Sequence, residues 1–183
     1  GVSDDLPQVR RELEVLSKFT DREVKIMNPS KRSDWPENES AEVWHYSGHA
    51  YLRTDNPFYS YLALSDGPLF AADFRLKSSQ VKLVTLAACR SGEQVALSGE
   101  EATGLVRSLL EMGARNVIAG HCPVADESTA FWMNEFYSRY FEDKSIGDAA
   151  TGASLKTMEK YPSACHWAAF SIFGAGDRTN EYH

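Results

Sequence analysis

An apolar run that ends in a cysteine is the sequence feature that constrains the fold of this chain most strongly. Residues 81–92 read Val-Lys-Leu-Val-Thr-Leu-Ala-Ala-Cys-Arg-Ser-Gly. The first half of this run is apolar and partly β-branched, which is typical of a buried strand in a parallel sheet. Reactive groups in open parallel sheets lie at the carboxyl edge, where the strands end. Cys89 is therefore either a thiol presented at that edge or a small buried hydrophobic residue, as free cysteines often are.

A second strand-like segment ends in a histidine. Residues 41–47 predict a strand that runs into Gly48-His49-Ala50. Two strands that end at the same edge of one sheet can bring His49 and Cys89 close together. An imidazole beside a thiol is the minimum for nucleophilic acyl transfer, because the imidazole moves the proton and the sulfur attacks a carbonyl. We interpret three other histidines as packed or surface residues: His45, His166 and His183.

The remaining pattern predicts alternating strands and helices. Together, the strand that begins the stretch 81–92, a helix over 99–112 that stops at Gly113, and a strand over 115–119 are predicted to form a βαβ unit. Further helices are predicted over 6–19, 70–76, 126–141 and from Ser145 to just before Pro162. Further strands are predicted over 23–27, 59–64 and 165–173, with a turn at 65–68 and surface loops over 28–40 and 93–98.

Composition narrows the class of protein. A chain of 183 residues fits one domain. The net charge of -7 argues against nucleic acid or an anionic membrane as the main partner. No run is apolar and long enough to span a bilayer, and the given sequence shows no signal-peptide pattern. The three cysteines, Cys89, Cys122 and Cys165, lack paired spacing, which predicts neither disulfides nor a zinc site and favours a reducing, cytoplasmic setting.

The order of these segments resembles the caspase-like cysteine peptidases and, within them, the CHAT domain (caspase, HetF-associated with TPRs). In that group one strand ends in His-Gly, and a later strand ends in a small residue before the nucleophilic cysteine. Residues 48–50 and 87–92 match those two places. The resemblance covers about 6–174, with further matches at 64–69, 104–107, 113–119, 124–126, 136–137 and 167–170. It implies an α/β fold: a three-layer α-β-α sandwich with a mostly parallel sheet, caspase-like.

The resemblance also implies a site and a function. His49 would be the general base and Cys89 the nucleophile, with the backbone N–H groups of Cys89 and Ala50 as the oxyanion hole. The chain would be a cysteine endopeptidase that cleaves a partner protein through a thioester acyl-enzyme, in prokaryotic signalling or defence, without a metal or organic cofactor. Two alternatives stay open: a catalytically silent CHAT module that binds a partner, and a thiol hydrolase of small amides. The presence of both His49 and Cys89 favours the peptidase.

Some positions depart from the family pattern or have two interpretations. Ala50 stands where the family usually has glycine, and a required positive φ would strain it. Gly-His-Cys-Pro at 120–123 replaces an expected tryptophan, and neighbouring His121 and Cys122 point to opposite faces of an extended segment, so they pair poorly. Asp126 could line a pocket for a basic substrate side chain or cap a helix. Glu93 and Gln94 follow the nucleophile and could contact substrate or lie in a solvated loop.

The family's first strand has no counterpart before residue 6, so we expect residues 1–183 to be a CHAT peptidase domain from a longer protein. Such domains often follow helical repeats, which commonly bind partners. We therefore expect an activating partner that binds a missing N-terminal repeat region. The loops over 28–40 and 90–98 are the segments expected to carry its signal, although both could be plain surface connections.

Overall fold

A six-stranded sheet forms the middle layer of the protein. The computed structural model describes Leu16 and residues 31–35, 40–53, 55–76, 78–89, 103–120 and 126–176. The strands are β1 (Ser40–Tyr51), β2 (Tyr61–Leu64), β3 (Gly67–Phe70), β4 (Gln80–Cys89), β5 (Asn116–Gly120) and β6 (Phe170–Gly174). The α-helices are α2 (Ala71–Phe74), α3 (Thr103–Met112), α4 (Asp126–Phe141), α5 (Ile146–Lys160) and α6 (Ala164–Trp167), and the 3-10 helices are η1 (Arg32–Asp34) and η2 (Pro57–Tyr59).

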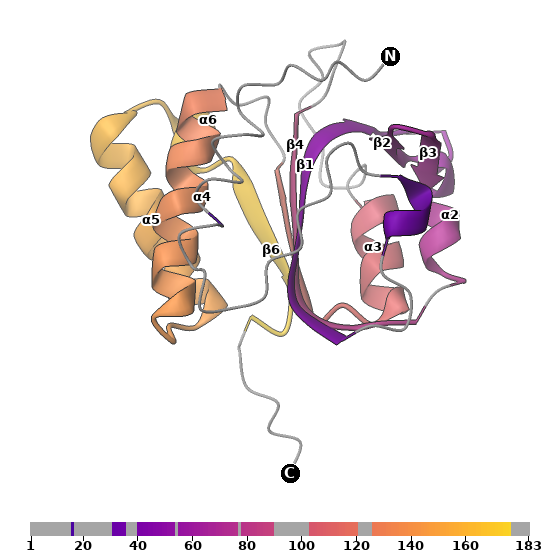
Figure 1. Ribbon diagram of the computed structural model, residues 1–183. Coiled ribbons are helices and arrows are strands. Elements are labelled where there is room, and N and C mark those ends of the chain that lie inside the picture. The colour runs from indigo at the N-terminus through magenta and orange to yellow at the C-terminus, as the bar shows by residue number, and fades with distance from the viewer. Residues whose placement is uncertain are drawn as a thin grey trace.

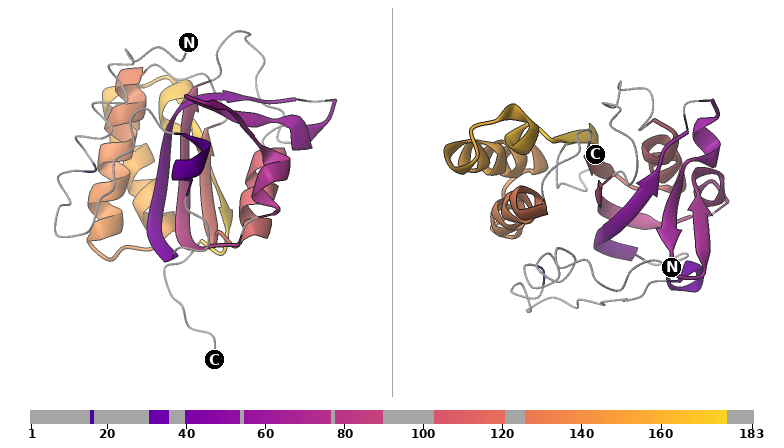
Figure 2. Two further views of the ribbon diagram at one scale, coloured as in Figure 1. Left: turned by 45° about the vertical axis from the view of Figure 1, so that its right-hand side comes forward. Right: turned by 90° about the horizontal axis from the view of Figure 1, so that it is seen from above.

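The strand order is β3-β2-β1-β4-β5-β6. The three central strands β1, β4 and β5 run parallel, and β2, β3 and β6 extend the sheet with antiparallel pairs at its edges. Helices α2 and α3 cover one face, and α4, α5 and α6 cover the other (Figure 1). Figure 2 shows the same two groups of helices on opposite faces from two further sides. The predicted α/β sandwich and the βαβ unit formed by β4, α3 and β5 are both confirmed.

The sheet is buried on both faces, so it has two hydrophobic cores. Alternate residues of β4 enter each of them: Val84 and Leu86 face α3, whereas Leu83 and Ala87 face α4. Burial on both sides explains why this strand reads as a continuous apolar run. The α3-side cluster consists mainly of Tyr46, Leu62, Leu69, Phe74, Val84, Leu86, Leu105, Val106, Leu109 and Val117. The α4-side cluster consists mainly of Leu83, Ile118, Trp132, Met133, Phe136, Tyr137, Tyr140, Ile146 and Ala153.

The helices follow their sequence signals closely. Helix α4 spans the predicted range, and α3 ends just before Gly113. Ser145 caps α5 as expected, because its Oγ accepts a hydrogen bond from the Asp148 N–H at 3.0 Å. None of the helices within the described ranges is both long and apolar enough to cross a membrane. Apart from Leu16, which is helical and packs against the α4-side cluster, the predicted elements over 6–19 and 23–27 and the loop over 93–98 lie outside the described residues.

Two predicted elements at the sheet edges are wrong in part. The strand predicted over 165–173 begins only at Phe170, and a turn of helix, α6, precedes it. Local contacts hold that turn, because His166 Nδ1 lies 2.8 Å from Ser128 Oγ and Trp167 Nε1 donates to the Pro162 carbonyl at 3.3 Å. Residues 67–70, interpreted as the end of a turn and the start of a helix, form β3. Pro68 is tolerated there because β3 is an edge strand.

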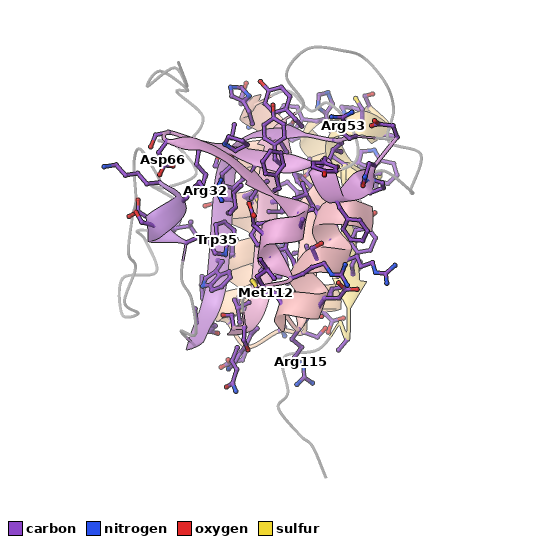
Figure 3. The ribbon with its side chains drawn as sticks, turned by 90° about the vertical axis from the view of Figure 1, so that its right-hand side faces the viewer. Arg32, Trp35, Arg53, Asp66, Met112 and Arg115 are labelled. Atoms are coloured by element: carbon purple, nitrogen blue, oxygen red, sulfur yellow. The ribbon has the colours of Figure 1, made fainter. Side chains whose placement is uncertain are left out.

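The described part of the loop over 28–40 is anchored to the fold. It contains η1, whose Arg32 N–H donates to Asp66 Oδ1 at 2.8 Å and whose Arg32 guanidinium donates to the Pro68 carbonyl at 2.8 Å. Figure 3 shows Arg32 beside Asp66, with Trp35 next to them against the body of the molecule. The Trp35 ring packs on Trp44 and Phe74, with centroids 5.4 and 5.0 Å away. This short segment is therefore more than a surface connection.

Candidate active site

The two residues predicted to form the site lie opposite one another on neighbouring strands. Strands β1 and β4 pair in parallel, with a register that runs from Ser40↔Gln80 to His49↔Cys89. Neighbouring strands lie about 4.8 Å apart. The backbones of His49 and Cys89 are therefore adjacent at the carboxyl edge of the sheet, where the sequence predicts them to meet.

Helix α4 identifies the face of the sheet on which His49 lies. The Tyr137 hydroxyl donates to Thr85 Oγ1 at 2.9 Å and lies 2.9 Å from His45 Nδ1. His45 and Thr85 are themselves register partners, four positions before His49 and Cys89. Because side chains alternate along a strand, His49 shares the α4 face with His45. On the face that α4 covers, the paired positions His45 and Thr85, which contact Tyr137, are therefore followed along the same two strands by the paired positions His49 and Cys89.

The hydrogen bonding of the His49 ring sets it apart from the other described histidines. His49 is half-buried, and its Nδ1 is buried without a hydrogen-bond partner among the described residues. Leaving such a group unpaired costs about 1–3 kcal/mol, so a native protein keeps few of them without a reason. The other two described histidines have partners, since His45 contacts Tyr137 and His166 contacts Ser128. These contacts agree with the interpretation of His45 and His166 as packed or surface residues. His183 lies outside the described residues.

Tyr46 contacts the end of β1 from the opposite face. Its ring belongs to the α3-side cluster, and its hydroxyl lies 2.9 Å from both the His49 and the Ala63 carbonyl oxygens. Burial raises the pKa of Tyr46, so the hydroxyl stays protonated and donates. Tyr46 is not among the site residues that the sequence pattern predicts. The spacing Tyr46-x-Gly48-His49 is the signal that could have identified it.

The strain expected at Ala50 is absent. Ala50 is a buried strand residue in register with Leu62, and among the described residues only Asp143 combines a side chain larger than glycine's with a positive φ. Alanine in place of the family's glycine therefore causes no backbone strain here.

The side chains at the remaining candidate substrate positions lie outside the described residues. Asp126 is the first residue of α4, and its side chain lies outside the described set, as do Glu93, Gln94, His121 and Cys122. Cys165, on α6, is exposed. Within the described ranges, no group of three or more His, Cys, Asp or Glu side chains could hold a metal ion.

Comparisons with known proteins give a family and a similar fold. A family model described as "CHAT domain" matches residues 1–175. A solved structure titled "Structure of Protease" is similar in fold, with a TM-score of 0.53 and 11% sequence identity. That match covers 76% of this chain and 35% of the other, so this chain spans about a third of the length of the protein it matches. A search of the curated proteins found no relative.

Proposed function

Because the chain belongs to the CHAT domain family and has a caspase-like α/β fold, we propose that it is a cysteine endopeptidase that cleaves a partner protein. His49 is the general base and Cys89 the nucleophile. One observation carries the proposal: His49 lies opposite Cys89 near the ends of two parallel strands, and its buried Nδ1 has no hydrogen-bond partner among the described residues. An imidazole with an open nitrogen next to a cysteine position is the arrangement that thiol acyl transfer requires.

The proposed reaction needs only these residues and water. His49 accepts the proton of the Cys89 thiol, and the sulfur adds to the carbonyl carbon of the substrate's peptide bond. Backbone N–H groups of Cys89 and Ala50 stabilise the oxyanion. The C–N bond then breaks, the amine leaves with the proton from His49, and a thioester to Cys89 remains. His49 next takes a proton from water, whose oxygen displaces the sulfur and releases the new carboxyl terminus.

Thiol alkylation tests the proposed pair without a known substrate. We expect iodoacetamide to modify Cys89 about ten-fold faster than exposed Cys165 at pH 7, because an imidazolium next to a thiol lowers its pKa from about 8.5. His49→Ala should remove that advantage and leave the Cys165 rate unchanged. Peptide mass spectrometry after timed labelling measures both rates in one sample. Equal rates at Cys89 in the wild-type and His49→Ala proteins would contradict the proposal.

An activating partner is also proposed, and η1 narrows the place where its signal could act. The bonds of Arg32 to Asp66 and Pro68, and the packing of Trp35, hold residues 31–35 against the sheet. This favours the loop over 90–98 as the responsive segment. On addition of an activator to the full-length protein, hydrogen exchange over 31–35 should therefore stay unchanged while exchange over 90–98 slows. A change at 31–35 alone would reverse this assignment.

A further inference from the structure

The Tyr46 hydroxyl occupies a place where the β1–β2 ladder stops. The antiparallel register comprises Tyr51↔Tyr61 and Ala50↔Leu62, so the next pair would join His49 to Ala63. The carbonyl oxygens of these two residues instead both lie 2.9 Å from the Tyr46 hydroxyl. A side chain of β1 thus bridges the two strands at the candidate histidine itself.

Gly48 provides the room for this bridge. A Cβ atom on Gly48 would lie 2.7 Å from the Tyr46 hydroxyl oxygen and 2.9 Å from its ring carbon Cζ. Real side chains do not approach so closely, so the Tyr46 ring could not stay over this position if residue 48 had a side chain. The glycine two residues after the tyrosine and the histidine one residue later therefore form a single structural unit.

The bridge can affect His49 only through the backbone. Tyr46 packs in the α3-side cluster, whereas the alternation of side chains along β1 places His49 on the α4 face. The hydroxyl contacts the carbonyl group of His49 and the neighbouring strand, not the imidazole. Removing the hydroxyl would take away a donor that lies between these two carbonyl oxygens, and we expect the β1 backbone at His49 to shift in response.

We propose that Tyr46 is a positioning residue for the active site: its hydroxyl links the β1 backbone at His49 to Ala63 of β2, and Gly48 makes that contact possible. This inference rests on the proposed function, because the group held in place is the His49 ring opposite Cys89. A displacement of about 1 Å at a catalytic group can cost a hundred-fold in rate, so a bond that fixes the strand end has a large effect on the chemistry.

The test compares Tyr46→Phe with Tyr137→Phe in the full-length protein, using iodoacetamide as the probe. Both variants remove a buried tyrosine hydroxyl with two polar neighbours. Alkylation of Cys89 is followed from pH 5 to pH 9, with Cys165 as the internal reference. We expect Tyr46→Phe to slow Cys89 alkylation about five- to ten-fold at pH 7 and to move its pH midpoint toward the ordinary thiol value of about 8.5. Tyr137→Phe should leave the midpoint in place.

Substitution of Gly48 provides a second, independent test of the same contact. Gly48→Ala should move the midpoint in the same direction, and the double variant Tyr46→Phe/Gly48→Ala should move it no further than Gly48→Ala alone, because both changes break one contact. An unchanged midpoint in folded Tyr46→Phe, with a shifted one in His49→Ala, would overturn the positioning role alone. An unchanged midpoint in His49→Ala as well would overturn the proposed catalytic pair together with it.

Discussion

Replacing Cys89 with alanine will abolish cleavage of the partner protein, and replacing His49 with alanine will lower its rate at least about a thousand-fold. Without the sulfur no thioester forms, and without the imidazole no group moves the proton between thiol, amine and water. Since the two residues act as one unit, the double variant should be little worse than either single variant.

Cleavage by these variants is measured by the new protein N-termini that it produces. Wild-type protein, Cys89→Ala and His49→Ala are each incubated with the proteins of the source cell, and the new N-termini are identified by mass spectrometry. Cys165→Ala is the matched thiol control and should cleave like the wild type, because Cys165 is exposed on α6. Thermal unfolding shows that each variant is folded.

The outcomes separate the three functions that the sequence leaves open. Termini that persist in Cys89→Ala would contradict the cysteine mechanism. No new termini from fully activated wild-type protein would point to a silent CHAT module that only binds its partner. Hydrolysis of small amides without any new protein terminus would point to a thiol hydrolase instead.

The part of the candidate site that could be predicted from the sequence is the part that depends on local sequence patterns. The apolar run before Cys89 and the segment before Gly48-His49 each predict a strand. Because functional groups in open parallel sheets lie at the carboxyl ends of the strands, both residues are predicted to lie at the same edge. What the pattern does not contain is the register that sets His49 opposite Cys89. That register depends on the packing of both faces of the sheet, because a shift by one residue would exchange the two hydrophobic cores.

The residues that contact the two site strands, such as Tyr46 and Tyr137, could not be predicted because their partners are far away in sequence. Tyr46 acquires its role from Ala63 on β2, and Thr85 acquires its contact from Tyr137 on α4. Dependence on contacts distant in sequence also explains why helix α6, just before β6, was predicted as part of a strand. A short apolar run such as 165–173 fits a strand or a buried helical turn, and contacts to Ser128 and Pro162 decide between them.

A single methyl group at Gly104 will destabilise the protein by about 3 kcal/mol. Gly104 is the second residue of α3, the helix that follows β4, and a Cβ there would lie 2.2 Å from the Pro57 carbonyl oxygen and 2.7 Å from the carbonyl carbon. Pro57 begins η2, in the connection that follows β1. Both contacts are with backbone atoms, so α3 and η2 must move apart. We expect the midpoint of thermal unfolding to fall by roughly 6–12 °C for a chain of this size.

Gly147→Ala is the matched control. For Gly104→Ala, helix propensity predicts an increase in stability, whereas the steric clash with Pro57 predicts a decrease. Gly147 is likewise the second residue of its helix, α5, but the nearest atom to an added Cβ is Ser145 Oγ at 3.9 Å. Helix propensity alone predicts that both substitutions stabilise, by up to about 1 kcal/mol. The close approach to Pro57 predicts that only Gly147→Ala is neutral or stabilising. If Gly104→Ala is also as stable as the wild type, then α3 does not pack directly on the backbone that follows the histidine strand.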